Sequence, residues 1–362
     1  MREADVVRLV ESAQLDDLQH LSAEIVYRHV DFLNRELPGP IDLYRRWEAQ
    51  QWSATALDFG LDRQQWAAMP RHVKAQLEAT FAGFFYGEQA VTDTLSPVLI
   101  GAPDEDQRLF LATQLVDEAR HSYFFSRLYN EVLGVPGGLR GALASLQVSD
   151  ADEPDPGYNA IFDARRGELV TTTEAVRRDP GDYRAWVEAI TVYHLMVEAL
   201  LALTGQRRVL RLLRSVDQLP AFRGGFTAVT RDESRHVSYG IWALRAAVRN
   251  GQEDAIQAVV DRTLAPCMLV YSDPRVEFPD PNELPPAARI DPLDTWNFAV
   301  DSLGKRLRTA RVDAEWASSV EERARSLIWA NVAEWERVHH AEHPARRWER
   351  GERGASAPQH VG

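Results

Sequence analysis

Two short segments, DEARH and DESRH, each place a glutamate three residues before a histidine inside an otherwise apolar stretch. Residues i and i+3 share one face of an α-helix, so Glu118 is aligned with His121. Glu233 is aligned with His236 in the same way. Leucines and phenylalanines continue both faces, so both pairs are expected to point into the protein interior. A carboxylate buried alone is so costly that it must be paired, protonated or bound to a metal.

Two further glutamates lie on apolar stripes, Glu88 in FFYGEQAVTDTL and Glu198 in TVYHLMVEALLALTG. The interval from Glu88 to Glu118 is 30 residues, and the interval from Glu198 to Glu233 is 35. Each interval corresponds to one helix, a turn and part of the next helix. The order along the chain therefore predicts two helical hairpins, each of which supplies three ligands to one interior site.

Four carboxylates and two neutral imidazoles suit a pair of iron or manganese ions, because carboxylates can bridge two ions. Four negative charges cancel two divalent cations, whereas a single zinc takes only four ligands, usually histidine or cysteine. A buried ionic network without metal is the alternative. It leaves two acids without partners, since Arg120, Arg231 and Arg235 fall mostly on other helix faces. The predicted metal ligands are Glu88, Glu118, His121, Glu198, Glu233 and His236.

The composition limits the other possible functions. The net charge is −13 and no basic run stands out, so nucleic acid is not an expected partner. Cys267 is the only cysteine, which excludes an intrachain disulfide or a multi-cysteine metal site and fits a reducing compartment. The N-terminus lacks the apolar core of a signal peptide, and the apolar stretch at 189–204 is too short to span a bilayer. We therefore expect a cytoplasmic protein without a membrane span.

Most of the chain has the composition and periodicity of long helices, without alternating strand-like runs. Long helices are predicted near 71–100, 105–133, 181–213 and 221–250, with shorter helical segments near 4–35, 40–50, 63–68, 254–270, 293–309 and 313–341. The segments 134–158 and 271–292 are expected to be irregular, and the latter contains six prolines. We expect a single helical domain over 1–345, with an additional N-terminal helical segment at about 1–40 and a disordered tail at 346–362.

The ligand order resembles that of ferritin-like dinuclear carboxylate bundles. The stretch WSATALDFGLDRQQW at 52–66 also resembles the segment that enters the bundle in small subunits of class I ribonucleotide reductase. The similarity spans roughly residues 41–250. It implies an all-α fold, a ferritin-like four-helix bundle with additional helices. Within this superfamily, the chain most resembles the ligand-binding oxidases.

That resemblance implies two metal ions, with a manganese–iron pair favoured and two irons as the other option, and O2 as the oxidant. It also implies a homodimer and an apolar ligand such as a long-chain fatty acid. The family mark is an ether cross-link between a valine three residues after the first Glu and a tyrosine five residues before the third. Val91 and Tyr193 hold these positions. Tyr193 could instead be a core residue whose hydroxyl contacts a carboxylate.

The expected function is therefore an O2-activating oxidase that removes two electrons from C–H bonds, with an electron donor that the sequence does not identify. A ribonucleotide reductase small subunit is one alternative, although Phe125 stands where its radical tyrosine is expected. A di-iron N-oxygenase of a small amine is another, with His194 as a candidate additional ligand. An iron-storage or structural bundle is disfavoured by the extra length and the unequal half-sites.

Each of the residues around the expected ligands has two possible roles. Asp117 and Asp232 directly precede the ligand glutamates, and they either orient ligand histidines through hydrogen bonds or are solvated acids. Apolar side chains on the ligand stripes are either walls of the site or ordinary core. These side chains are Phe84, Phe125, Phe226 and Leu201.

Overall fold

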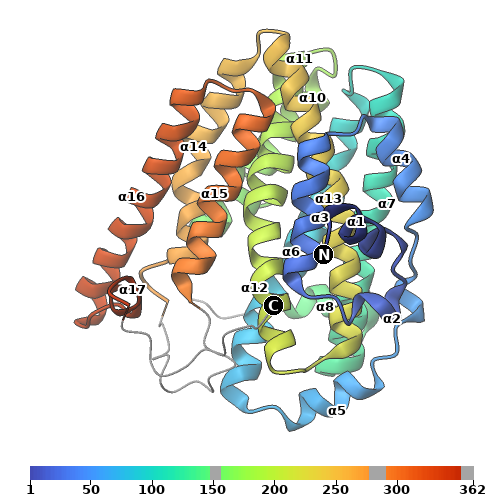
Figure 1. Cartoon of the computed structure of the whole chain (residues 1–362), viewed down its shortest axis with the longest axis vertical. Helices are drawn as coiled ribbons and strands as arrows, with labels where there is room; N and C mark the ends of the chain where they lie inside the picture. The colour runs from blue at the N-terminus through green and yellow to red at the C-terminus, as the bar shows by residue number, and fades with distance from the viewer. Residues whose placement is uncertain (147–155, 277–290, 352–362) are drawn as a thin grey trace.

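The computed structural model describes residues 1–146, 156–276 and 291–351, which are mostly helical and contain no strand. Four long helical runs form a central bundle (Figure 1). These runs are α6 (Arg71–Ile100), α7 (Glu105–Leu128) continued by η2 (Tyr129–Leu133), α11 (Tyr183–Ile190) continued by η3 (Thr191–Ala202) and α12 (Leu203–Ser215), and α13 (Pro220–Arg249). The expected all-α, ferritin-like fold is confirmed, and the four long helices lie within two residues of their predicted positions.

Local sequence signals set the ends of these helices. The Asp104 carboxylate accepts a hydrogen bond from Gln107 N at the start of α7, and Asp182 caps α11 in the same way. Gly134, with φ of 79°, ends the run that begins with α7, because glycine adopts this left-handed conformation without strain. Pro220 occupies the first position of α13, where its missing N–H has no intrahelical partner to lose.

Two segments of the bundle are π-helical, η2 at the end of α7 and η3 in the middle of the run from Tyr183 to Ser215. In a π-helix the backbone bonds run from i to i+5, so the turn is wider than in an α-helix. Tyr193 and Glu198 are five residues apart within η3, so they share one side of this widened turn. The apolar periodicity of the sequence does not predict this change of helix type.

The remaining helices surround the bundle. They are α1 (Glu3–Ser12), α2 (Leu15–Leu18), α3 (Ala23–Glu36), α4 (Pro40–Ala49), η1 (Ala54–Ala56), α5 (Gly60–Ala68), α8 (Gly138–Leu146), α9 (Pro156–Phe162), α10 (Glu168–Arg178), α14 (Glu253–Ser272), α15 (Pro292–Ala310), α16 (Ala314–His339) and α17 (Pro344–Glu349). In Figure 1, α14, α15 and α16 flank one side of the bundle, and α4 lies beside α7 on the other.

Several expectations need adjustment. The helical segment expected at 4–35 is divided into α1, α2 and α3, and part of the irregular stretch expected at 134–158 folds as α8 and α9. The helix α17 covers residues 344–349, so the first part of the expected tail at 346–362 is helical. The rest of that tail after residue 351 and most of the proline-rich stretch at 271–292 lie outside the described residues.

The additional N-terminal segment is tied to the bundle by a buried arginine. Arg231 of α13 is 2% exposed and donates hydrogen bonds to the carbonyl oxygens of Ala13 at 2.8 Å and Gln50 at 2.9 Å. The Tyr27 hydroxyl of α3 also donates to the carbonyl oxygen of Leu203. Apolar residues of α2 and α3 belong to the same buried cluster as the bundle core. The N-terminal helices are therefore part of the packed structure.

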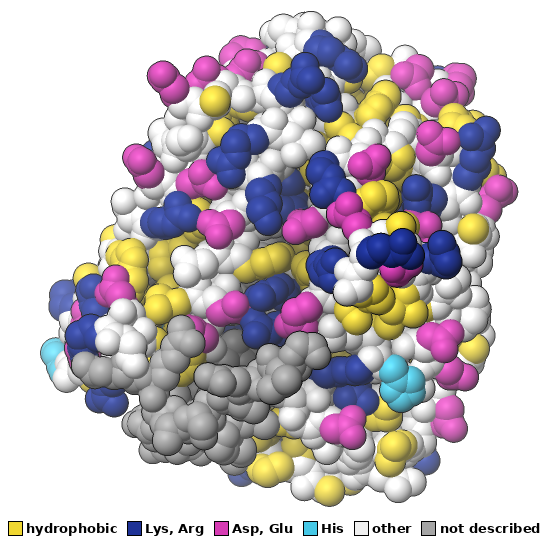
Figure 2. Space-filling model, in the orientation of Figure 1, with side chains coloured by type: hydrophobic (Ala, Val, Ile, Leu, Met, Phe, Trp, Pro, Cys, Tyr) yellow, Lys and Arg dark blue, Asp and Glu magenta, His cyan; other side chains and the backbone are white. Residues whose placement is uncertain are grey.

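Among the described residues, one helix, the continuous run from Tyr183 to Ser215, is long and apolar enough to cross a membrane. Within it, 89% of the most apolar stretch is buried inside the protein. The burial of this stretch in the bundle accounts for its composition. On the face shown in Figure 2, acidic and basic side chains are interspersed, and no basic stripe crosses it.

We predict that Arg231→Met lowers the free energy of unfolding by about 2–4 kcal/mol, because buried carbonyl oxygens lose a charged donor. Urea unfolding followed by circular dichroism measures this change. Arg178→Met is the matched control, since the Arg178 side chain is 74% exposed and should leave stability within about 0.5 kcal/mol of the native value. Equal stabilities for the two variants would contradict the buried anchoring role.

Candidate metal centre

The four long helical runs bring all six predicted ligand residues together. Glu88 comes from α6, Glu118 and His121 from α7, Glu198 from η3, and Glu233 and His236 from α13, and each is at most 7% exposed. Two groups of potential ligand atoms form, each with its atoms within 4.8 Å of one another. One group contains Glu88, Glu118, His121 and Glu233, and the other contains Glu118, Glu198 and His236.

The glutamates of the two Glu-x-x-His motifs lie between the two histidines. His121 Nδ1 is 3.7 Å from Glu118 Oε2 and 3.7 Å from Glu233 Oε1. His236 Nδ1 is 3.2 Å from Glu118 Oε1 and 3.5 Å from Glu233 Oε2. Glu118 and Glu233 are therefore placed where carboxylates could bridge two ions.

The other two glutamates lie at the ends of the cluster. Glu88 Oε2 is 3.2 Å from His121 Nδ1, and Glu198 Oε1 is 3.3 Å from His236 Nδ1. Each end thus offers one histidine and one glutamate of its own, in addition to the two shared carboxylates. This arrangement provides a complete set of oxygen and nitrogen donors for two neighbouring cations.

Buried atoms without partners show that the residues fit a metal pair. Glu198 Oε2, Glu233 Oε2 and His236 Nδ1 are fully buried and have no hydrogen-bond partner among the described residues. An unpaired buried carboxylate oxygen is costly unless a cation satisfies it. Four carboxylates carry the charge that two divalent cations would neutralise, and hard oxygen donors with imidazole suit iron and manganese.

The pKa values of the cluster residues also favour a metal site. Burial raises the pKa of Glu88 to about 7, of Glu198 to about 8 and of Glu233 to about 7. Burial alone would lower the pKa values of His121 and His236, but the surrounding carboxylates raise them well above the ordinary value. The cluster thus retains protons without metal, and a cation would have to displace them.

The two histidines are held by aspartates of the opposite motif. His121 Nε2 lies 3.2 Å from Asp232 Oδ2, and His236 Nε2 lies 3.1 Å from Asp117 Oδ2. A carboxylate only accepts, so each Nε2–H donates to its aspartate and each Nδ1 is left facing the cluster. Both aspartates are fully buried, which excludes the reading of Asp117 and Asp232 as solvated acids.

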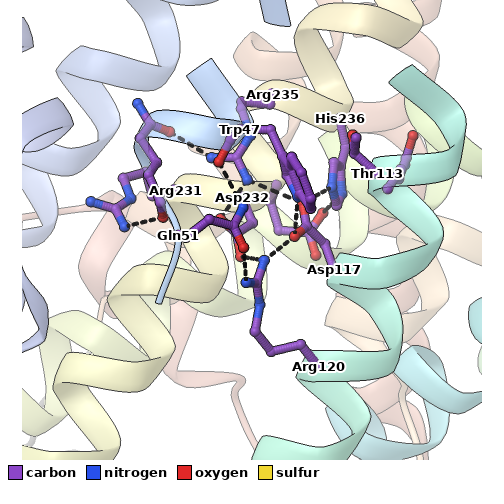
Figure 3. Close-up of polar contacts among 12 residues, drawn as sticks. Trp47, Gln51, Thr113, Asp117, Arg120, Arg231, Asp232, Arg235 and His236 are labelled. Atoms are coloured by element: carbon purple, nitrogen blue, oxygen red, sulfur yellow. Dashed lines mark hydrogen bonds and ion pairs between the residues drawn. The ribbon is translucent and has the colours of Figure 1, made fainter. Parts of the chain in front are cut away.

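Two arginines neutralise this pair of aspartates (Figure 3). Arg235 Nη2 donates to Asp232 Oδ1 at 2.6 Å and to Asp117 Oδ2 at 3.0 Å. Arg120 Nη2 also donates to both aspartates, at 3.4 Å to Asp232 Oδ2 and in a closer contact to Asp117 Oδ1. The charges of this outer layer cancel, so the negative charge of the four glutamates is left for the metals.

Two tryptophans complete the outer layer. Trp47 Nε1 donates to Asp117 Oδ1 at 2.9 Å, and Trp52 Nε1 donates to Asp232 Oδ2 at 2.7 Å. The sequence interpretation did not assign roles to these tryptophans or to Arg120 and Arg235. Both motifs contain an arginine directly before the histidine, and this repetition could have indicated a role. In the structure each arginine pairs with the aspartate three residues before it.

A second polar group lies beside Glu118 and Glu198. The Tyr193 hydroxyl donates to Glu118 Oε1 at 2.8 Å. Gln114 Nε2 donates to the Tyr193 oxygen at 2.8 Å and to Glu198 Oε1 at 3.0 Å. His194 Nε2 lies 3.1 Å from Gln114 Oε1, and its ring packs on that of Tyr193, but His194 belongs to neither ligand group.

The other candidate residues are apolar side chains packed in or against the core. Val91 is 4% exposed and lies one turn after Glu88 on α6. The rings of Phe84, Phe125 and Phe226 pack on one another, with centroids 5.0–6.2 Å apart. Leu201 is 6% exposed. These side chains therefore belong to the core or pack against it.

No protein-family model matches the chain. Solved structures of R2-like ligand-binding oxidases are similar to it in fold. The protein from Sulfolobus acidocaldarius is 22% identical, with a TM-score of 0.54, over 79% of this chain and 90% of that chain. An R2-like ligand-binding oxidase variant with an anaerobically reconstituted Mn/Fe cofactor is 20% identical, with a TM-score of 0.55, over 80% and 93%. At this identity the comparison establishes the shared fold.

We predict that the thermal stability of the metal-free protein falls as pH rises from about 6.5 to 8. Below about 6.5 this trend is opposed by His29, His194 and His343, whose pKa values burial lowers to about 3, 3 and 4, so that they favour the folded state as pH rises. Glutamates whose folded pKa lies above the unfolded value near 4.5 stabilise the fold fully below that value, and this contribution is lost as pH rises through about 7–8. The raised histidine pKa values act in the same direction. Scanning calorimetry of metal-free protein measures the trend.

Metal-loaded protein is the control for this pH series, because it has the same surface charges but its ligands carry no protons to lose. Its melting temperature should change less over the same range, so the stabilisation by metal should increase with pH. A metal-free protein that becomes more stable between pH 6.5 and 8 would contradict the protonated cluster.

We predict that Asp117→Asn weakens metal binding by about 10–100-fold, because His236 loses the carboxylate that orients its ring. Competition with a chelator, followed by metal analysis of the protein, measures the affinity. Asp93→Asn is the matched control, since Asp93 is exposed on α6 and bonds only with Gln89 among the hydrogen bonds identified. Unchanged affinity in the Asp117 variant would exclude this orienting role.

Proposed function

We propose that the protein is a dinuclear metal oxidase, with a Mn/Fe pair favoured over two irons, that uses O2 to remove two electrons from a C–H bond. The observation that carries the proposal is the convergence of four buried glutamates and two oriented histidines from four helices. The shared fold with R2-like ligand-binding oxidases, some of which contain a Mn/Fe cofactor, supports the choice of metals. When bound, the metal pair supplies the redox chemistry with O2.

The residues of the chain would bind the ions, orient the ligand side chains and exclude water from the site. Glu88, Glu118, His121 and Glu233 would hold one ion, and Glu118, Glu198 and His236 would hold the other, since these are the two groups whose ligand atoms lie together. The crossed contacts with Asp117 and Asp232 fix both imidazole rings before metal arrives. Full burial keeps bulk water away from the ligands, which strengthens every electrostatic interaction in the site.

We extend the proposal to an ether cross-link between Val91 and Tyr193. Forming it breaks one C–H bond of Val91 and the O–H bond of Tyr193, makes one C–O bond, and transfers two hydrogens with two electrons to O2. The hydrogen bond from Tyr193 to Glu118 gives the phenolic proton a nearby acceptor. Both side chains are buried, which supports an internal reaction over one with a solvent-borne group.

The proposal also includes an apolar ligand with the chemistry of a long-chain fatty acid, a homodimer and a cytoplasmic location. The apolar ligand is proposed from the resemblance to ligand-binding oxidases, and the apolar side chains of Phe84, Phe226 and Leu201 are compatible with its chemistry. The buried thiol of Cys267, the only cysteine, agrees with a reducing compartment.

Metal analysis and peptide mass spectrometry test this function. Protein produced with both metals and exposed to air should contain manganese and iron in a 1:1 ratio. Its digest should contain the Val91 and Tyr193 peptides joined and lighter by two hydrogens. Tyr193→Phe should retain both metals and give separate peptides, because the metal ligands are unchanged and the phenolic oxygen is absent.

Other outcomes distinguish the alternatives. Separate peptides of normal mass in the native protein would remove the cross-link but leave the metal centre. A stable radical signal and activity with a reductase large subunit would assign the protein to ribonucleotide reduction. Oxidised nitrogen products from amines would assign it to the N-oxygenases. Protein that binds no manganese or iron would overturn the proposed function.

A further inference from the structure

A cleft of about 580 Å³ opens at the end of the bundle where α11 begins (Figure 1). This volume lies within the range of sites that bind small molecules. The cleft is formed by the loop between α6 and α7, the first turns of α7 and α11, and the last turns of α13. Its lining includes the ring-bearing residues Tyr183 and Trp242 and the polar residues Gln107, Arg108 and Asn250.

A chain of aromatic rings leads from this cleft to the metal centre. The Trp242 ring is nearly parallel to that of Tyr239, with centroids 6.5 Å apart and an angle of 19° between the planes. From Tyr239 the chain continues to His194, 5.3 Å away, and then to Tyr193, 4.4 Å further on. The Tyr193 hydroxyl donates to Glu118, so the chain ends on a predicted metal ligand.

A second branch leaves Tyr239 through Phe110. The centroids of these two rings are 4.8 Å apart, and Phe110 meets the ring of His236 edge to face at 6.5 Å. Tyr239, Phe110 and His236 are all fully buried. Both branches therefore end at the same ligand group, which contains Glu118, Glu198 and His236.

The rings of this chain are held in place by the surrounding helices. The Tyr239 hydroxyl donates to Oε1 of Gln107, which lines the cleft, at 3.0 Å. Gly240 allows the close packing of η3 on α13, because a Cβ at this position would lie 2.1 Å from the Cβ of His194. Trp242 is half-buried at the cleft, whereas Tyr239 and His194 are at most 1% exposed. The chain thus meets solvent at Trp242 and is enclosed from Tyr239 inwards.

We propose that the cleft binds a small aromatic reductant of the flavin class, and that Trp242 and Tyr239 carry its electrons to the metal centre. The proposal rests on the proposed function, which requires an electron donor. Electron tunnelling weakens steeply as the gap between π systems widens, and ring contacts keep each gap in this chain short.

The cleft has the chemistry that a flavin ring requires. Trp242 and Tyr183 supply aromatic side chains for stacking on a planar ring. Asn250 is exposed, and the Arg108 side chain is 40% exposed, so both can donate to the oxygen and nitrogen atoms at the edge of such a ring. A concave site of this volume suits a small molecule better than the flat surface of a protein donor.

The electrons and protons of the donor balance in this scheme. Oxidation of one reduced flavin releases two electrons and two protons. The electrons pass singly through Trp242 and Tyr239, and each of the two bound ions is reduced by one of them. The protons leave the flavin for solvent at the open side of the cleft, so they do not cross the apolar interior.

Binding of riboflavin to the metal-free protein tests the occupant of the cleft. Flavin fluorescence measures this binding, because stacking on an indole ring quenches it. Trp242→Leu should weaken binding by about 10-fold, since it removes the stacking ring. Trp316→Leu is the matched control, because Trp316 is also half-buried but lies on α16 and does not line the cleft. Its affinity for riboflavin should equal that of the native protein.

Stopped-flow mixing of air-oxidised, metal-loaded protein with photoreduced riboflavin, without O2, tests the route. The rate of flavin oxidation by the native protein should reach a plateau as the flavin concentration rises. Trp242→Leu should lower this plateau several-fold as well as raise the half-saturating concentration, whereas loss of a residue that only binds flavin would change the half-saturating concentration alone. Tyr239→Phe should keep the native plateau, because the ring contacts remain.

Metal-free protein should bind riboflavin without oxidising its reduced form. Absence of riboflavin binding, or a native plateau in Trp242→Leu, would overturn the proposal. A plateau that falls instead in Trp52→Leu would also overturn it and would place electron entry at the ring that stacks near His121. Protein that binds riboflavin but neither manganese nor iron would overturn the proposed function and the route, while the cleft would remain a flavin site.

Discussion

Burying four carboxylates inside an apolar helical bundle is the constraint on which the rest of the structure depends. Each of these groups would destabilise the fold if it were charged and unpaired. Two layers of polar residues offset this cost. An inner layer of glutamates and histidines leaves charge and unpartnered atoms for cations, and an outer layer of Asp117, Asp232, Arg120 and Arg235 is neutral in itself. The bundle and its surrounding helices exclude water from both layers.

Much of this could be predicted from the sequence, because the four bundle helices are long and strongly periodic. Glu88 and Glu198 can be predicted as ligands because a charged residue is rarely buried on an apolar stripe unless it is paired. Helix spacing aligns each glutamate with its histidine, but it does not say which carboxylates lie in the middle of the cluster. The shared position of Glu118 depends on how two hairpins dock, which no local pattern encodes.

The features that escaped prediction are those that depend on contacts between distant segments. The contact of Asp117 with His236 joins residues 119 positions apart, and Trp52 reaches Asp232 over 180 positions. The π-helical turn of η3 is held by its surroundings in the core and has no distinctive composition. On α7, Leu109, Val116 and Tyr123 repeat at the interval of a buried helix face but are about half exposed, which the sequence alone could not show.

The crossed aspartates have a consequence for how the centre is assembled. Neither hairpin contains both a ligand histidine and the aspartate that holds it, since His121 depends on Asp232 and His236 on Asp117. A half-protein, or a folding intermediate with one hairpin formed, would present imidazoles free to rotate. The orientation of both imidazole rings is thereby tied to completion of the tertiary fold.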